Sequence, residues 1–388
     1  MKRDYDTIVL GLGGIGSGAL YWLSCRLGGE VLGLEQFATG HDRGGSQDQS
    51  RIIRYSYHRP FYVDLAARAY RTWAALEEET GERLVHRCGG LDLFPENGTI
   101  PALDYTSSLD ACGIPYVRMH AAEIRRQWPA FTLPDSVWGL YQRDGGLVAA
   151  AKGNAAHLRA AQAHGAKWRE SAPVTALRAT AGEVEITAGG VGYRCRRLVL
   201  AAGAWSNAAL AHLGLRLPLT VTREQVVYYT APDLAPFALD RFPVWIWMDE
   251  PCFYGFPVFG EAAVKIAEDV GGQETTAETR SFEPDAAGLE RVRNFCRAHL
   301  PGALGPELRV KTCLYTLTPD RDFVVDSLPD HPEILIAIGA GHAFKFASAL
   351  GQVLSELALD GRSDADLSAF SFARPILHQA DPPKSFFV

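Results

Sequence analysis

Hydrophobic and polar positions near the start of the chain follow a strand–turn–helix–strand pattern. The apolar run at 8–10 meets a cluster of glycines at 11–18, after which apolar residues recur with helical spacing, and a second apolar run at 31–34 ends in Glu35. Continuous apolar runs of this length are typical of buried strands. We therefore expect a strand, a glycine turn, a helix and a second strand to fill residues 6–35.

A long helix is expected after Pro60, because proline is favoured at the first helical position. Leu65, Ala69, Trp73 and Leu76 follow at spacings of four, four and three residues, which places them on one face. The other α/β-type segments predict a helix over 149–164, strands near 173–178, 183–187 and 198–204, strands at 323–326 and 334–338, and a helix over 344–359.

Composition narrows the function classes. The 388 residues are 47% hydrophobic and 21% charged, with a formal charge of −7 and no basic run. These values predict a large buried core and argue against nucleic acid or an acidic membrane surface as a partner. The sequence shows no secretory or membrane-spanning apolar segment, and its seven cysteines form no CxxC pair. We expect a cytoplasmic protein without disulfides or a metal site.

The turn Gly11-Leu12-Gly13-Gly14-Ile15-Gly16 has the GxGxxG pattern. Its first glycine permits a tight turn, the second lets backbone N–H groups approach a pyrophosphate, and the third lets the helix pack on the strand. Glu35 follows 19 residues after Gly16, where an acidic side chain receives a ribose hydroxyl. The pattern predicts an adenine dinucleotide, with FAD favoured over NAD by the position of the turn; an ordinary glycine-rich turn is the alternative.

Two stretches interrupt the dinucleotide-type rhythm. Residues 86–144 and 218–304 mix short strands and helices, including strands at 222–229 and 263–267 and a helix over 287–299. We therefore expect an α/β protein, α+β overall, with two interleaved domains and the site at their junction. These are a Rossmann-type FAD-binding domain (1–85, 145–217 and 305–388) and a smaller sheet-based substrate domain (86–144 and 218–304).

Three further clusters could carry chemistry, and each also has a structural interpretation. Arg51 and Arg54 could clamp a carboxylate, or they could be a solvated basic pair. Cys313 could be reactive, although its pattern alone indicates a buried strand cysteine. The segment 339–346 is a glycine-rich turn that opens a helix, whose free N–H groups favour an anion; it could equally be an ordinary α/β turn.

Together these segments resemble the monomeric sarcosine oxidase family, whose members are N-methyl amino acid oxidases with covalent FAD and a fold like those of glycine oxidase and D-amino acid oxidase. The likeness extends over essentially the whole chain. It rests on the glycine turn and on four further motifs: Ser50-Arg51-Ile52-Ile53-Arg54 for T-R-I-I-R; Tyr254-Gly255-Phe256-Pro257 with Val264-Lys265-Ile266; Lys311-Thr312-Cys313-Leu314-Tyr315-Thr316 for the flavinylation segment C-x-Y-T; and Gly341-His342-Ala343-Phe344-Lys345-Phe346 for G-H-G-F-K-F.

The resemblance implies roles for the matched residues. Arg54 and Lys345 would hold the substrate carboxylate, and Lys265 would promote the reaction with dioxygen. Cys313 would form a thioether with the 8α carbon of FAD. The remaining catalytic positions would be Arg51, Tyr254, Tyr315 and His342. Beside the glycine turn, Glu35 and Cys313, the cofactor site would include Ser50, Arg51, Val174, Gly203, Gly341, Phe344 and Lys345.

The resemblance also implies an activity: oxidation of a sarcosine-like N-methyl amino acid to an imine, with dioxygen reduced to hydrogen peroxide, by a monomer. A larger secondary amino acid is the first alternative, such as N-methyltryptophan, a pipecolate- or proline-type substrate or a glycated amino acid. A dehydrogenase is disfavoured by the presence of Lys265. A non-catalytic flavin-binding subunit would need none of Arg54, Lys265, Tyr315 or Lys345.

One departure from the family concerns the substrate. The family's lysine is followed four residues later by an active-site histidine, whereas this chain has Asp269. A negative charge there would change the charge felt by the amine and the flavin. Nearby, Trp245 and Trp247 would share one face of a strand and Met248 the other. The sequence leaves open which of the two faces lines the cavity.

Overall fold

The glycine turn joins a strand and a helix as the sequence predicts. In the computed structural model, which describes residues 3–180 and 182–385, β1 (Arg3–Leu10) leads into α1 (Gly14–Leu27), and β2 (Val31–Leu34) pairs parallel with β1. A Cβ atom added to Gly16 would lie 1.8 Å from the carbonyl oxygen of Gly11, which itself has φ 87°. Only glycine therefore closes this turn.

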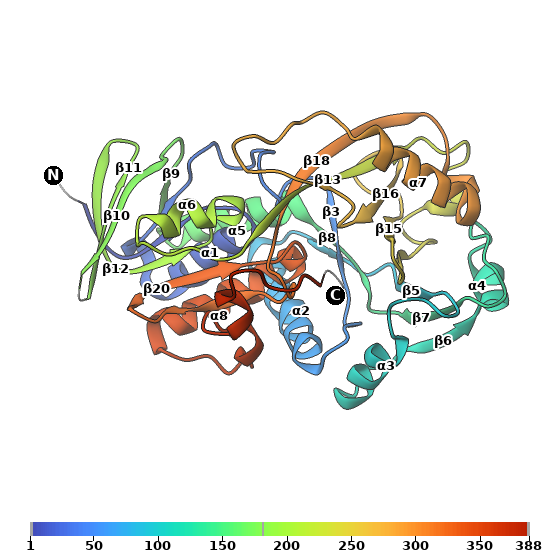
Figure 1. Cartoon of the computed structure of the whole chain (residues 1–388), viewed down its shortest axis with the longest axis horizontal. Coiled ribbons are helices and arrows are strands. Elements are labelled where there is room, and N and C mark those ends of the chain that lie inside the picture. Colours follow the sequence, from blue (N-terminus) through green and yellow to red (C-terminus); the bar gives the residue numbers. More distant parts are fainter. Residues whose placement is uncertain (1–2, 181, 386–388) are drawn as a thin grey trace.

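Figure 1 shows two large sheets at opposite ends of the molecule. The first contains eight strands and holds β1 and β2 near its middle. Helix α1 packs on α5 (Ala150–Ala163) and α8 (Ala347–Asp360). The other six strands of this sheet are β9 (Lys167–Arg169), β10 (Val174–Thr180), β11 (Glu183–Ala188), β12 (Val191–Leu200), β19 (Val324–Leu328) and β20 (His331–Ile338).

The second sheet has nine strands and carries the expected substrate-side segments. It consists of β5 (Gly90–Phe94), β6 (Val117–His120), β7 (Trp138–Gln142), β13 (Thr220–Tyr229), β14 (Val244–Trp247), β15 (Cys252–Phe256), β16 (Val264–Asp269), β17 (Gln273–Glu274) and β18 (Glu307–Leu317). Helices α3 (Ala102–Ala111), α4 (Ala121–Gln127) and α7 (Ala286–His299) accompany it.

The pairing of β18 differs from the domain boundary expected at residue 305. Along its length β18 pairs antiparallel with β13, so residues 307–317 belong to the second sheet and not to the first. The chain returns to the first sheet only at β19. The cysteine segment is therefore part of the wall between the two large sheets.

A small third sheet and a long helix connect the two halves. The sheet contains β3 (Ser50–Ile53), β8 (Gly146–Ala149) and β4 (Val85–His86), and β3 lies between the two larger sheets in Figure 1. Helix α2 (Pro60–Thr80) follows β3. Because Ser50, Arg51 and Arg54 lie on or next to β3, this arrangement brings them to the junction of the two halves.

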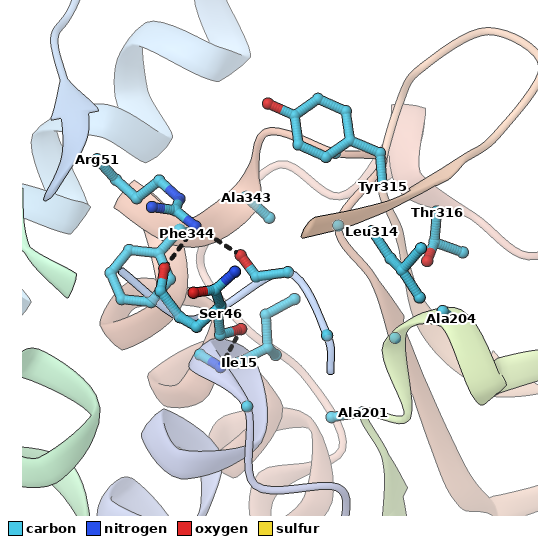
Figure 2. A pocket seen from close by; sticks show the side chains of 18 of the residues that line it. Ile15, Ser46, Arg51, Ala201, Ala204, Leu314, Tyr315, Thr316, Ala343 and Phe344 are labelled. Atoms are coloured by element: carbon cyan, nitrogen blue, oxygen red, sulfur yellow. Dashed lines mark hydrogen bonds between the residues drawn. The ribbon is translucent and has the colours of Figure 1, made fainter. Parts of the chain in front are cut away.

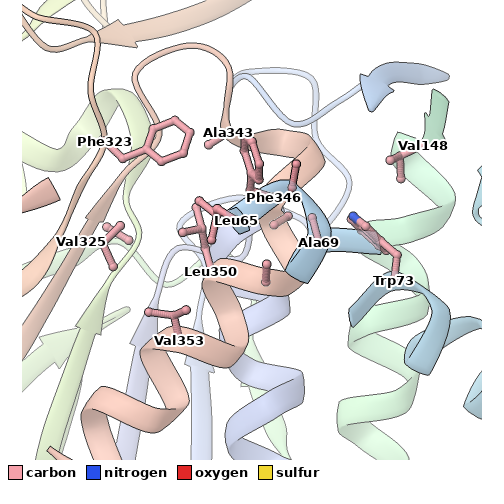
Figure 3. Close-up of a cluster of buried hydrophobic side chains, with 14 of the residues drawn as sticks. Leu65, Ala69, Trp73, Val148, Phe323, Val325, Ala343, Phe346, Leu350 and Val353 are labelled. Atoms are coloured by element: carbon pink, nitrogen blue, oxygen red, sulfur yellow. The ribbon is translucent and has the colours of Figure 1, made fainter. Parts of the chain in front are cut away.

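The expected apolar face of α2 is buried in the core drawn in Figure 3. Leu65, Ala69 and Trp73 pack with Leu350 of α8, and each is at most 4% exposed. A fully buried large apolar side chain contributes roughly 1.5–3 kcal/mol. The indole Nε1 of Trp73 also donates to the backbone carbonyl of Lys345 at 2.8 Å. The core thus fixes the turn that carries Lys345.

Two predicted elements differ in extent. The helix expected from residue 344 begins as a 3₁₀ turn, Ala343–Phe346, and becomes α-helical at 347. The strand expected at 198–204 begins earlier, at 191, because β12 also pairs with β11, and it ends at 200. Among the described residues, no helix is long and apolar enough to cross a membrane.

Candidate active site

A cavity of about 620 Å³ lies at the junction of the sheets and receives nearly all the predicted site residues. The glycine turn, Glu35, Val174 and Gly203 line one end. We call this the cofactor end. The opposite end, which we call the substrate end, is lined by Arg54, Tyr254, Lys265, Asp269, Tyr315, Arg321, His342 and Lys345. Figure 2 shows part of the lining, with Ile15 and Ser46 below Arg51 and Phe344. Three predicted residues, Gly16, Ser50 and Cys313, are not among the lining residues.

The cofactor end has the shape and charge of a dinucleotide cradle. Glu35 accepts hydrogen bonds from the N–H groups of Leu12 at 2.8 Å and Phe37 at 3.1 Å, and His41 lies 3.6 Å away. Burial opposes ionisation of Glu35, but these partners outweigh it and lower the pKa of the carboxyl. An ionised carboxylate can accept the two hydroxyls of a ribose.

The N-terminus of α1 faces the same end. The N–H of Gly14 donates to Ser46 Oγ at 2.8 Å (Figure 2), a hydroxyl that a phosphate oxygen could replace. A Cβ atom on Gly14 would lie 3.0 Å from the ring of Phe344, so side chains at this position would narrow the cradle. The residues present therefore fit a bound FAD.

Arg51 is held by hydrogen bonds to backbone carbonyl groups. This excludes the interpretation of Arg51 and Arg54 as a solvated pair of basic side chains. The Arg51 guanidinium donates to the carbonyl oxygens of Ser50, Gly45 and Gln47 at 2.7–2.9 Å. It also lies 5.8 Å from the centroid of the Phe344 ring. Figure 2 shows these two side chains next to each other. Arg51 is thus held at the boundary between the cofactor end and the substrate end of the cavity.

Cys313 lies on β18, two residues before Tyr315 and therefore on the same face of the strand. Its side chain is buried. Burial raises the pKa of the thiol to about 11, although the nearby Arg51 acts in the opposite direction. The thiol is thus protonated at neutral pH, and Arg51 and Lys265 are cations near enough to stabilise its thiolate.

Lys265 forms a buried ion pair that the sequence did not reveal. Its Nζ lies 2.7 Å from Oδ2 of Asp48 and donates to the carbonyl oxygen of Ser50 at 2.9 Å. Asp48 also accepts the hydroxyl of Tyr228 at 2.8 Å. Burial lowers the pKa of Lys265 to about 8, with Asp48 opposing this shift. The ammonium therefore predominates at neutral pH.

Arg54 and Lys345 meet around Tyr57 at the substrate end. Arg54 Nη1 donates to Asp92 Oδ1 at 2.7 Å, so its charge is already balanced, while its buried Nε has no hydrogen-bond partner within residues 3–180 and 182–385. Lys345 Nζ donates to the Tyr57 hydroxyl at 2.8 Å. Among the described parts of the chain, no carboxylate lies within 4 Å of this ammonium. Burial and the nearby Arg54 lower the pKa of Lys345 to about 7.

The walls of this end are aromatic and sulfur-containing. Tyr254 and Tyr315 both line it. The sequence left open which face of the strand around residue 246 lines the cavity. In the structure, Trp245 and Trp247 pack on Phe295 of α7, while Ile246 and Met248 line the cavity. His342 is partly buried, and its Nε2 lies 3.1 Å from the carbonyl oxygen of Arg321. Burial lowers the pKa of this imidazole well below its usual value.

Four residues of the site escaped sequence reasoning: Asp48, Tyr57, Asp92 and Arg321. Asp92 had a signal, because it is a single acid within the apolar strand Gly90–Phe94. A buried acid in such a run requires a cation partner. For Arg321 the sequence held no such signal, because this residue lies in a polar turn where an arginine is ordinary.

Comparisons with known proteins agree with the resemblance. Residues 6–357 match the family model described as FAD dependent oxidoreductase. The chain is 31% identical over 389 residues to monomeric sarcosine oxidase from Arthrobacter sp. (strain TE1826), covering 98% of this chain and 99% of the relative. It is 33% identical over 377 residues to N-methyl-L-tryptophan oxidase from Yersinia pestis, covering 96% and 99%.

Solved structures show the same fold. The open form of NikD, an amino acid oxidase essential for nikkomycin biosynthesis, superposes with a TM-score of 0.84 at 26% identity, covering 100% of this chain and 99% of that one. Glycine oxidase from Geobacillus kaustophilus gives 0.80 at 19% identity, covering 96% and 99%.

Proposed function

The chain belongs to the family of FAD-dependent oxidoreductases, and we propose that it is an oxidase of secondary, N-methyl amino acids of the sarcosine type. One observation carries this proposal: Arg54 and Lys345 meet around Tyr57 in the cavity whose other end is the dinucleotide cradle. This geometry supports an amino acid held by its carboxylate next to a flavin.

FAD would be held by residues from both halves of the chain. The glycine turn and Glu35 would bind its pyrophosphate and ribose, and Val174 and Gly203 would line the rest of the cradle. When bound, FAD supplies the redox chemistry: it accepts a hydride from the carbon beside the amine and returns the electrons to dioxygen, which becomes hydrogen peroxide. We propose that Cys313 holds the cofactor covalently, supported by the proximity of Arg51.

At the substrate end, the proposal assigns binding and orientation to the protein. Lys345 is the cation of this end that has no carboxylate partner among the described residues, so it would contribute most to binding the substrate carboxylate. Arg54, already paired with Asp92, would add a hydrogen bond through its unsatisfied Nε. Orientation of this kind replaces random collision with a fixed approach. Tyr254 and Tyr315 would exclude water from the amine.

Lys265 would supply positive charge for the reaction with dioxygen. It is held by Asp48 and by the carbonyl oxygen of Ser50, so its position does not depend on substrate. We expect the protein to work as a monomer, in keeping with the name of its 31% identical relative.

A larger substrate is the second candidate, favoured by the 33% identity to an N-methyl-L-tryptophan oxidase. A panel of sarcosine, N-methyltryptophan, pipecolate, proline and a glycated amino acid, assayed for hydrogen peroxide, separates the two. Turnover highest with sarcosine supports the first candidate, and turnover with N-methyltryptophan alone supports the second. Peroxide with none of them contradicts both.

A further inference from the structure

We propose that Asp269, held by Arg321, binds the amino nitrogen of the substrate and so determines which ligands the cavity accepts. The inference deepens the proposed function and rests on it for the kind of substrate. It follows from an ion pair in the cavity wall, from strained backbone around that pair and from the position of Lys345.

The ion pair is built into the wall of the cavity. Arg321 Nη2 lies 2.8 Å from Asp269 Oδ2, and both residues line the cavity. The side chain of Arg321 is 2% exposed, whereas that of Asp269 is 22% exposed. Within the described residues, Asp269 Oδ1 accepts no hydrogen bond. One oxygen of the carboxylate is therefore fixed by Arg321 while the carboxylate as a whole still has open surface.

Strained backbone surrounds this pair. Val270, Arg321 and Ala340 have φ of 57°, 60° and 44°, in the left-handed region that residues other than glycine rarely adopt. For Val270 the conformation is especially unfavourable because its side chain is β-branched. All three are connected to the pair: Val270 follows Asp269, and the carbonyl oxygen of Ala340 accepts from Arg321 Nε at 3.4 Å. Such strain concentrates at functional sites, where the surrounding structure enforces it.

Neighbouring contacts fix Arg321 further. His342 Nε2 lies 3.1 Å from the carbonyl oxygen of Arg321, so the backbone of this turn is tied to the turn of Lys345. Arg374 binds both carboxylate oxygens of Asp320 on the preceding residue, at 2.8 and 3.0 Å. The turn is therefore held from both sides, and Asp269 has a rigid partner.

The charges around the cavity point to the amino nitrogen as the group that Asp269 receives. At the substrate end, Arg54, Lys265 and Arg321 are each paired with an acid, which leaves Lys345 for the carboxylate of an amino acid. Asp269 is close enough to Lys345 to raise its pKa against burial. An α-amino acid carries its nitrogen on the carbon next to its carboxylate. A ligand bound to Lys345 would therefore present its N–H within reach of Asp269.

Two planar carboxylates that differ in one atom test this assignment. Pyrrole-2-carboxylate has an N–H beside the carbon that bears the carboxylate, and 2-furoate has an oxygen there. Titration of the flavin-loaded protein, followed by the flavin absorbance or by calorimetry, gives both dissociation constants without turnover. A hydrogen bond to a carboxylate predicts that pyrrole-2-carboxylate binds at least about tenfold more tightly.

Substitutions then assign the preference to Asp269. In Asp269→Leu the affinity ratio should fall to within about twofold of one, because only the N–H ligand loses an acceptor. Because Asp269→Leu breaks the ion pair with buried Arg321, the double variant Asp269→Leu/Arg321→Met is measured as well, which removes both charges of that pair together. Glu268→Gln is the matched control: it lies next on β16, pairs with Arg291 and should keep the wild-type ratio.

A preference for pyrrole-2-carboxylate that persists in either folded variant overturns the proposal, as does equal affinity of the wild-type protein for both ligands. Bleaching of the flavin by sarcosine reports separately on the proposed function. If the affinity ratio depends on Asp269 but no secondary amino acid reduces the flavin, the substrate assignment fails and the binding role stands. If a secondary amino acid reduces the flavin but the affinity ratio does not depend on Asp269, the binding role of Asp269 fails and the substrate assignment stands.

Discussion

The ammonium of Lys265 and the carboxylate of Asp48 form a buried ion pair, with Nζ 2.7 Å from Oδ2. Arg51 lies 4.0 Å and Arg309 3.5 Å from the same carboxylate. Asp48 itself has φ 88°, a conformation that aspartate tolerates better than most residues. Asp48 thus sits among three cations, and Glu261 pairs with the outermost of them, Arg309, at 2.7 Å. The five groups together are net positive while Lys265 is protonated and neutral once it loses its proton.

Lys265→Met should slow the reaction with dioxygen much more than reduction of the flavin by substrate. A unit charge about 4 Å away contributes roughly 4 kcal/mol at an effective dielectric constant of ~20, or about a thousandfold in rate. Because Asp48 offsets part of this charge, we expect reoxidation to fall by about ten- to a hundredfold. Stopped-flow measurement of the two half-reactions checks this, and equal slowing of both would refute the assignment.

Asp48→Asn should move the pH dependence of reoxidation. Lys265 has a pKa of about 8, so its charge is present below pH 8 and lost as the pH rises. Removing the carboxylate removes a group that favours the ammonium, and the inflection should move down by about one to two pH units. Glu261→Gln, which alters only the outer partner of Arg309, should leave the profile in place. An upward shift in Asp48→Asn would contradict the account.

Carboxylate binding should depend on the protonation of Lys345. Its pKa is about 7 without a ligand, and a bound carboxylate raises that value. The dissociation constant of methylthioacetate should therefore be flat below pH 7 and rise by about tenfold per pH unit above it. Lys345→Met should bind weakly with no such slope, whereas Lys311→Met, at another position on the cavity wall, should keep it. A slope that survives in Lys345→Met would assign the proton elsewhere.

Covalent attachment can be separated from simple binding by acid precipitation. We expect the flavin of the unmodified protein to stay with the pellet and that of Cys313→Ala to be released. Cys252 is a second cysteine near the site and lines the cavity, so Cys252→Ala is the matched control and should retain its flavin. Release from the unmodified protein would show that Cys313 forms no thioether.

Local patterns predicted the parts of the fold that depend on neighbouring residues. The glycine turn follows from sterics within a few residues, and the apolar face of α2 follows from its period, since Leu65 and Trp73 are both buried. The pairing of Arg54 with Asp92 joins segments 38 residues apart, and that of Arg321 with Asp269 joins segments 52 apart. No local spacing encodes such partners. The sequence therefore could not predict which acid pairs with which cation.

The same limit applies to β18. Its residues are compatible with either sheet, and only its pairing with β13 places it in the second one. The motif around Cys313 was recognisable, but its position in the wall between the sheets depends on that long-range pairing. The departure at Asp269 was visible in the sequence, whereas its partner Arg321 was not.

Anaerobic titration of the purified protein with sarcosine tests the central claim most directly. We predict a yellow protein whose flavin absorbance bleaches as sarcosine is added and returns on admission of air, with hydrogen peroxide formed in proportion. A colourless protein, or a flavin that keeps its absorbance with sarcosine and with every other secondary amino acid of the panel, would contradict it.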